Sequence, residues 1–199
     1  MGICGNINTG AAYDCTQKDT GGIEQVEIVL INRSDIDLSS TTVNRNPSSG
    51  EHNISSFDLI NGAVAYSFSG IQSKRILSAS YTKQDGEFID TVAHTVNIAI
   101  YNQCEESLNT LNEFVNGAEV VAIVEQKSKG TNNECAFQIY GFDRGLKAGE
   151  LTYNSNENNG IVLLPLSSRE PDFEPYVPYK YEETDYATTL TKIEELKNP

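Results

Sequence analysis

The 199-residue sequence has no tryptophan, one methionine and only four cysteines. Without tryptophan, the largest flat stacking side chain, a carbohydrate-stacking site is poorly supported. The cysteines are widely spaced and form no C-x-x-C pair, which excludes a dense disulfide framework and the common zinc and redox motifs. A bridge between Cys4 and Cys15 stays open as an alternative to two free thiols. Cys135 alternates with Phe137 and Ile139, which predicts a small core residue.

Basic residues are also scarce, with 14 lysines and arginines against 28 aspartates and glutamates and a net charge of −14. Such a surface repels phosphate, which argues against a sequence-reading nucleic-acid binder. The simplest interpretation is solubility, but the charge also suits a surface along which DNA passes without adhering. No apolar run is long enough to span a membrane and the first residues show no targeting pattern, so we expect no membrane partner and synthesis in the cytoplasm.

Side chains suited to acid–base catalysis are few. The two histidines, His52 and His94, are the only groups that ordinarily titrate near neutral pH, and neither has a partner close in sequence. His52 lies in a polar segment. His94 shares parity with Val92 and Val96 in a predicted strand, which indicates a core or interface histidine held by a backbone carbonyl rather than a general base.

One segment superficially matches a calcium-binding loop. Residues 154–165 place asparagines at loop positions 1, 3 and 5, but position 6 is Asn159 rather than glycine and position 12 is Pro165 rather than glutamate. Residues 141–145 lack the glycine spacing of a phosphate loop and predict a strand end followed by a turn. We therefore expect no enzyme activity, no metal site and no cofactor.

The clearest structural pattern covers residues 91–146, which read as strand, helix, strand, turn and strand. Residues 91–101 alternate as a strand with one apolar face, and residues 104–115 then switch to helical spacing. The predicted helical stripe consists of Leu108, Leu111 and Val115. Residues 119–125 and 135–142 follow as two core strands.

The remainder of the first 168 residues predicts short strands separated by turns. Residues 26–31 are apolar on both faces except at Glu27, which places them centrally in a sheet. Asn61-Gly62 is the strongest hairpin signal, and residues 84–86 and 154–160 mark two more. The pattern predicts a mainly β fold, an antiparallel β-sandwich or barrel with one packed α-helix.

We divide the chain into an N-terminal arm over residues 1–22, a β-sandwich domain over 23–168 and a C-terminal arm over 169–199. Within the sandwich, residues 32–56 are polar and predict a long loop, either projecting or mobile.

The C-terminal arm differs from the rest because three prolines alternate with aromatic residues over residues 169–181, which favours extended backbone. Residues 184–197 then predict a short helix capped by Thr184 or Asp185, with Ala187, Leu190 and Ile193 on one stripe. The arm either folds back on its own domain or reaches a neighbouring subunit, and we expect its removal to leave a folded monomer that cannot assemble. The residues predicted to contact a neighbour are Phe173, Tyr176, Tyr179, Tyr181, Tyr186, Leu190 and Ile193.

The order of these parts and three phrases, ICGNINTGAAYDC, GGIEQVEIVLINRSDI and FQIYGFDRGLKAGELT, resemble structural proteins of tailed bacteriophages, particularly those that infect Bacteroides-like bacteria. The resemblance covers most of the chain and rests on order and short phrases rather than on a catalytic signature. It implies a tail-tube or connector-ring subunit, a β-sandwich flanked by a helix, whose loops and arms clasp adjacent subunits.

This resemblance implies a non-enzymatic virion protein that forms a ring or tube in the tail or neck through which the genome passes. The implied partners are further copies of the chain, adjacent tail or neck proteins, and double-stranded DNA only in transit. An alternative is a β-sandwich recognition module, adhesin-like or fibre-associated, that binds a host surface ligand. A hydrolase built from distant polar residues on a β-sandwich is a third, weaker hypothesis.

Overall fold

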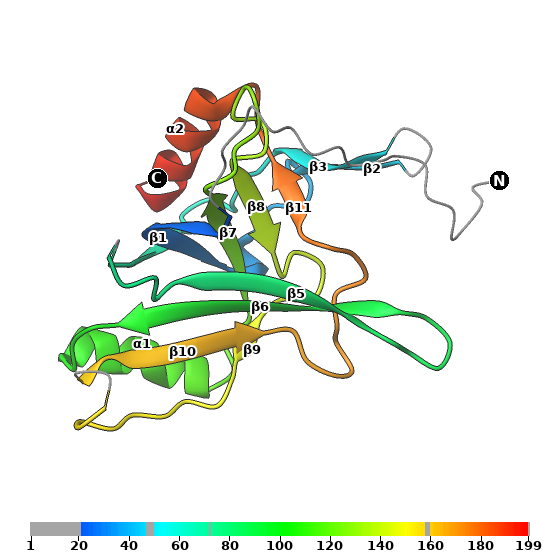
Figure 1. Cartoon of the computed structure of the whole chain (residues 1–199). Coiled ribbons are helices and arrows are strands. Elements are labelled where there is room, and N and C mark those ends of the chain that lie inside the picture. Colours follow the sequence, from blue (N-terminus) through cyan, green and yellow to red (C-terminus); the bar gives the residue numbers. More distant parts are fainter. Residues whose placement is uncertain (1–20, 47–49, 72, 158–159, 199) are drawn as a thin grey trace.

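The structure, a computed structural model, describes residues 21–46, 50–71, 73–157 and 160–198 (Figure 1). It is mainly β, with two sheets packed together, a helix against the sandwich and a second helix near the C-terminus. The predicted fold class is therefore confirmed.

The larger sheet has seven strands in the order β2-β3-β11-β8-β7-β1-β4, and the smaller sheet has four in the order β5-β6-β10-β9. The strands of the larger sheet are β1 (Ile23–Asn32), β2 (Thr42–Asn46), β3 (Glu51–Ser56), β4 (Tyr66–Ser69), β7 (Val120–Gln126), β8 (Phe137–Tyr140) and β11 (Tyr179–Tyr181). Those of the smaller sheet are β5 (Ser78–Gln84), β6 (Thr91–Ile100), β9 (Lys147–Ala148) and β10 (Val162–Ser167). The helices are α1 (Glu105–Val115), α2 (Tyr186–Lys197) and a short 3-10 helix, η1 (Arg33–Asp35).

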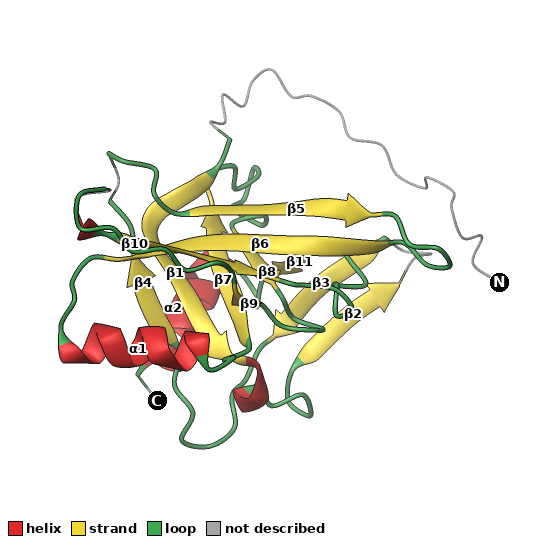
Figure 2. Cartoon of the chain, turned by 90° about the horizontal axis from the view of Figure 1, so that it is seen from below, coloured by secondary structure: helices red, strands yellow, loops and turns green. Residues whose placement is uncertain are grey.

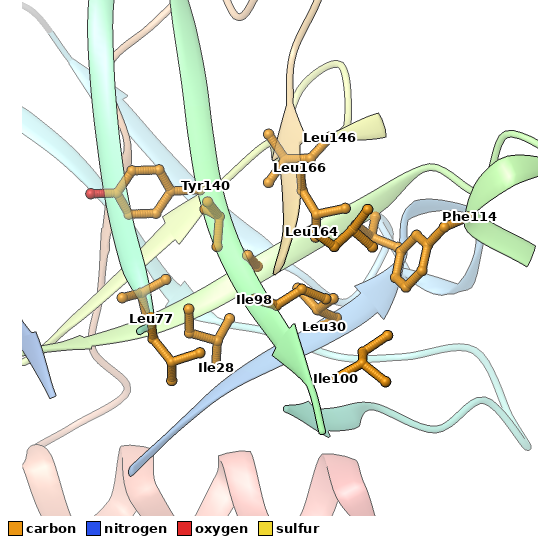
Figure 3. Packing of buried hydrophobic residues seen from close by; sticks show 14 of the residues in the cluster. Ile28, Leu30, Leu77, Ile98, Ile100, Phe114, Tyr140, Leu146, Leu164 and Leu166 are labelled. Atoms are coloured by element: carbon orange, nitrogen blue, oxygen red, sulfur yellow. The ribbon is translucent and has the colours of Figure 1, made fainter. Parts of the chain in front are cut away.

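A continuous apolar core lies between the two sheets, and Figure 3 shows its packing. β6 contributes Val96, Ile98 and Ile100 at period two, which is the apolar face predicted from the sequence. Ile28 and Leu30 of β1 belong to the same cluster on the side of the larger sheet. The predicted strand is confirmed, and it forms the middle of the smaller sheet between β5 and β10.

Helix α1 closes one end of this core through Leu111 and Phe114, and the Phe114 ring lies 6.2 Å from that of Phe68 in β4. The predicted helix is confirmed. Its predicted stripe is wrong at two positions, because Leu108 and Val115 are 43% and 67% exposed. Since the helix lies at one end of the sandwich (Figure 2), only a narrow face of it meets the sheets.

The other face of the larger sheet carries a second apolar core, which α2 covers. Val29 and Ile31 of β1 and Val121 and Ile123 of β7 belong to it, so both strands are buried on both faces. Strands of this kind read as continuous apolar runs because neither face meets solvent. The predicted inner strand over residues 26–31 is confirmed, and it lies between β7 and the edge strand β4.

The first turn of α2 is capped by Asp185, whose side chain accepts the backbone N–H of Thr188 at 2.7 Å. One of the two predicted caps is therefore confirmed. The buried residues of α2 are Thr189, Ile193 and Leu196. Of the predicted stripe, Ile193 is buried, whereas Ala187 and Leu190 are exposed, because the face that meets the sheet follows the spacing i, i+4 and i+7 from Thr189.

The prediction of a long loop over residues 32–56 is wrong for the described part of that segment. It contains η1 and an antiparallel hairpin of β2 and β3. The hairpin lies at one edge of the larger sheet, and Ile54 is the only buried residue of its two strands, so these strands lack the alternation by which strands are recognised. Its stabilising partner is β11, which comes from the far end of the chain and pairs with β3 in parallel.

The turns are predicted better than the strands around them. Asn61 and Gly62 form the predicted turn, in which Gly62 has a φ of +86° and one hydrogen bond of 3.0 Å closes the turn. The predicted hairpin around it is wrong, because β4 pairs with β1 instead. The hairpin of β5 and β6 is confirmed, whereas the third predicted hairpin is reduced to one bridge between Thr152 and Leu163.

The prediction for Cys135 is also wrong, because this residue is exposed. Strand β8 begins only at Phe137, so Cys135 belongs to the turn before the strand and not to its buried face. Cys4 and Cys15, and residues 1–20 of the predicted N-terminal arm, lie outside the described residues.

The C-terminal arm folds back on its own chain. Its strand β11 lies between β3 and β8, pairing with β8 in antiparallel and with β3 in parallel (Figure 1). Tyr179 and Tyr181 at its two ends are each 1% exposed. The arm therefore supplies part of the second core and joins the β2–β3 hairpin to the rest of the larger sheet.

This placement reverses our expectation that the chain folds without residues 169–199. We predict that Tyr181→Ala lowers the free energy of unfolding by about 3–5 kcal/mol, because it leaves a cavity in the second core. Tyr176→Ala is the matched control at an exposed position of the same arm, and it should change stability by at most about 1 kcal/mol. Urea denaturation followed by circular dichroism measures both, and equal effects would contradict the buried position of Tyr181.

Candidate functional site

The arm is anchored by a buried carboxylate. Glu174 is 1% exposed, and its side chain accepts the backbone N–H groups of Asp143, Arg144 and Gly145 at 3.0, 2.8 and 3.2 Å. Its own backbone exchanges two hydrogen bonds with Val92 at the start of β6. Burial raises the pKa of Glu174, and the three N–H donors oppose that change.

The turn that holds this carboxylate is the segment over residues 141–145. Gly141 and Gly145 have φ values of +76° and +87°, which glycine adopts readily. The prediction of a strand end followed by a turn is confirmed. The consecutive N–H groups form a concave anion-binding surface, but a side chain of the same chain already occupies it.

His94 is held in the same region and is 1% exposed. Its Nε2 lies 2.9 Å from the carbonyl oxygen of Tyr176, and its Nδ1 accepts the N–H of Gly141 at 3.1 Å. These partners select the neutral ring with the proton on Nε2, and burial lowers the pKa of His94 to about 4. The predicted core histidine satisfied by a backbone carbonyl is confirmed.

An aromatic cluster fastens the arm to the β2–β3 hairpin. The Arg45 guanidinium lies 5.1 Å from the ring centroids of both Tyr176 and Tyr179, and it pairs with Asp143 at 2.6 Å. The Tyr179 hydroxyl donates to Asp143 at 2.9 Å. His52 stacks on Tyr179 with ring centroids 4.2 Å apart. The cluster is thus a structural clamp whose polar groups are already paired.

The seven predicted contact residues divide into three groups. Tyr179, Tyr181 and Ile193 are buried in their own chain, so in this fold they are not accessible to a neighbouring molecule. Phe173 and Tyr186 are half-buried, and Tyr186 stacks on Phe137 of β8. Tyr176 and Leu190 are 44% and 37% exposed and stay candidates for contact with a neighbour. The prolines of residues 169–181 favour extended backbone, from which we predicted a projecting arm. Extended backbone is equally compatible with a strand that joins a sheet, as β11 does.

A more exposed apolar surface lies at the loop between β5 and β6. We call residues 84–90 the β5–β6 tip; it projects from the body of the molecule in Figures 1 and 2. Phe88 and Ile89 are 89% and 76% exposed. Lys83 bridges Asp85 and Asp90 at 2.7 Å each, which braces the loop while both apolar side chains point outward. The sequence did not predict this exposed apolar surface, although Phe88 and Ile89 stand between the acidic residues Glu87 and Asp90.

Two hollows face the other end of the β5–β6 hairpin. The first, which we call the α1–β4 groove, has a volume of about 810 Å³ and lies between α1, β4 and the end of β6. Tyr66 and Tyr101 line it and are 55% and 37% exposed. Glu106 and Glu113 of α1 also line it. The groove is therefore partly apolar and acidic.

The second hollow, which we call the amide recess, has a volume of about 590 Å³ and lies between the first half of β5 and the larger sheet. Gln138 accepts hydrogen bonds from Gln126 at 3.2 Å and from the Tyr140 hydroxyl at 3.1 Å. Gln25 binds both backbone polar groups of Leu77. Burial raises the pKa of Tyr140 to about 12, so its hydroxyl keeps its proton at neutral pH.

Two cations line the amide recess, Arg75 and Lys127. Within the described part of the chain neither forms an ion pair, and no aspartate or glutamate lines the recess. In a chain with 28 acidic residues, this hollow is locally basic.

The described residues include no cluster of three or more metal-ligating side chains. No helix in the described part of the chain is long and apolar enough to cross a membrane. Comparison with protein-family models, with curated proteins and with solved structures finds no match.

The buried His94 yields a prediction about stability and pH. A histidine in the unfolded chain takes up its proton near pH 6.5, whereas folded His94 does so only near pH 4. Between these values the unfolded state binds more protons, so the free energy of unfolding falls as the pH falls. The difference amounts to roughly 3 kcal/mol. Urea denaturation across this range should show the loss in the wild type and a smaller loss in His94→Gln.

His52→Gln is the matched control for this experiment. His52 lies on β3 with its ring against Tyr179, and the His52→Gln variant should lose stability between pH 6.5 and pH 4 nearly as the wild type does. An unchanged pH dependence in His94→Gln would contradict the assignment of the acid sensitivity to His94.

Proposed function

We propose that this chain is a non-enzymatic structural protein of a tailed-bacteriophage virion that assembles head to tail into a ring or tube in the tail or neck. The observation that carries the proposal is the separation of two kinds of contact surface along the β5–β6 hairpin. The apolar β5–β6 tip lies at one end, and the amide recess and the α1–β4 groove lie toward the other. Contacts between unlike surfaces continue from copy to copy and close into a ring when the rotation permits.

The sheet edges support assembly as well. β4 ends the larger sheet and β5 ends the smaller one. Each carries a large exposed side chain, Tyr66 at 55% and Tyr81 at 53%. Edge strands present unpaired backbone groups, which in an assembly can be covered by the adjacent copy. Together with the tip, these strands account for several of the large apolar or aromatic side chains exposed on the chain.

The charge supports passage of DNA through such an assembly. With a net charge of −14, the chain as a whole repels the phosphate backbone. Most cations in the described part of the chain are already paired with carboxylates, such as Lys197 with Glu27 and Lys192 with Asp58. A wall of this composition lets a genome move without adhering to it. The resemblance to phage structural proteins supports the same role.

A second candidate function is a recognition module that binds a host surface ligand. The amide recess favours it, because glutamine side chains and the Tyr140 hydroxyl are groups that can hydrogen-bond sugar hydroxyls. The recess has an open, partly exposed wall formed by Ser80 and Tyr81. This candidate predicts binding by a monomer, whereas the ring predicts self-association.

We expect the purified full-length chain to self-associate, with a sedimentation coefficient that rises with concentration and with open-centred rings or tubes in negative-stain electron micrographs. Tyr176→Ser and Leu190→Ser test the arm residues that stay accessible, and each should weaken assembly if the arm contributes to the contact. Double-stranded DNA should not be retained in a mobility-shift assay at moderate salt. A monomer at every concentration that binds a host glycan on an array would contradict the ring and support the recognition module.

A further inference from the structure

We propose that the β5–β6 tip of one copy inserts into the amide recess of the next copy, so that an acidic apolar loop occupies a locally basic hollow. The inference rests on the head-to-tail assembly proposed above and names its contact. In this contact the tip with Phe88 and Ile89 on one molecule meets the recess with Arg75 and Lys127 on another.

The tip has the composition of a surface that is covered in an assembly. Phe88 and Ile89 are adjacent and almost fully exposed, in a loop that Lys83 and its two carboxylate partners brace. A pre-formed loop loses little conformational freedom when it binds. Glu87, Asp85 and Asp90 surround the apolar pair with three carboxylates against the one lysine. The tip is therefore apolar at its centre and acidic at its rim.

The amide recess is complementary in both respects. Its walls include the apolar side chains of Leu77, Ala79 and Tyr81, and its cations are Arg75 and Lys127. Like-charge repulsion is absent because no carboxylate among the described residues lines it. Complementary charge at an interface steers association and fixes its register, while burial of the aromatic anchor supplies most of the affinity.

Arg75 carries a further indication of such a role. Its φ is +48°, in the left-handed region where glycine is favoured and a long side chain is disfavoured. Backbone strain of this kind is often found where a side chain serves a binding purpose. Here the strained residue is one of those that line the hollow that the proposal fills.

The positions of the two surfaces make the contact one between copies. The recess is lined by Leu77 and by the first residues of β5, up to Tyr81, and the tip begins at the last residue of β5, Gln84. At roughly 3.3 Å per residue, the tip begins roughly 10 Å from Tyr81 and roughly 20 Å from Ser78, and it continues the hairpin away from the start of β5 (Figures 1 and 2). One molecule therefore cannot fill its own recess with its own braced tip, and the contact must repeat from one copy to the next.

The α1–β4 groove is the competing receptor for the tip, and its charge disfavours it. Glu106 and Glu113 line that groove and would face the three carboxylates of the tip. Juxtaposed like charges weaken association and reject a partner. The α1–β4 groove is therefore not the proposed receptor, and the experiment below tests it as the alternative.

A complementation experiment with full-length chains tests the contact. The tip variant, Phe88→Ser with Ile89→Ser, keeps the recess, and the recess variant, Arg75→Glu with Ser80→Glu, keeps the tip. Each variant changes only exposed side chains, so both should fold. Each alone should associate at least about tenfold more weakly than the wild type. An equimolar mixture should form one-to-one dimers and nothing larger, because each pair retains a single intact contact.

Matched controls separate this contact from general surface effects. Leu38→Ser removes an apolar side chain that is 69% exposed elsewhere, and Arg144→Glu reverses an exposed cation outside the recess. Both should assemble as the wild type does. Asn109→Arg narrows the α1–β4 groove at an exposed position and should also leave assembly unchanged.

The outcomes distinguish the contact from the ring. Wild-type rings together with a mixture that stays monomeric, or loss of assembly in Asn109→Arg alone, would overturn the tip–recess contact and leave the ring standing. Mixed dimers together with open filaments of the wild type would uphold the contact and overturn the ring. A wild type that stays monomeric at every concentration would overturn both.

Discussion

The arrangement of this protein depends on the backbone hydrogen bonds of β11, a strand of three residues in the C-terminal arm that joins β3 to β8 in the larger sheet. Without them β3 and β8 would each present an unpaired edge inside the domain, where unmet backbone groups are unfavourable. Tyr179 and Tyr181 bury their rings at either end of the strand and bind Asp143 and Glu183 through their hydroxyls. The strand thus combines backbone pairing with some of the largest side chains of the second core.

The approach to β11 also ties the two sheets together. The backbone of Glu174 pairs with β6 of the smaller sheet, while its carboxylate holds the turn that follows β8 of the larger one. His94 repeats the connection, since its ring lies between the carbonyl of Tyr176 and the N–H of Gly141. These polar links are buried and fully used within the chain, which is why the region that resembles an anion site serves structure instead.

The surfaces left for other molecules lie away from this anchored region. The β5–β6 tip, the amide recess and the α1–β4 groove border the smaller sheet and α1, away from the part of the C-terminal arm that pairs with β3 and β8. Because the arm fastens the sheets to one another, the tip and the recess keep a constant separation within each molecule. A constant separation between unlike contact surfaces is what a ring or tube with a regular repeat requires.

The sequence by itself determined the class of fold, the strand of residues 91–101, helix α1, the cap of α2 and the turn at Asn61-Gly62, because these follow from local periodicity and turn chemistry. It also indicated the buried state of His94 through its parity with apolar neighbours. Only the tertiary structure decided that Tyr179 and Tyr181 belong to the core of their own chain, that residues 42–46 and 51–56 pair as two strands and that Phe88 stays outside. Pairing between β3 and β11 joins residues 127 positions apart, such as Asn53 and Lys180, and leaves no local periodicity to read. Exposure likewise depends on which surfaces the fold leaves uncovered.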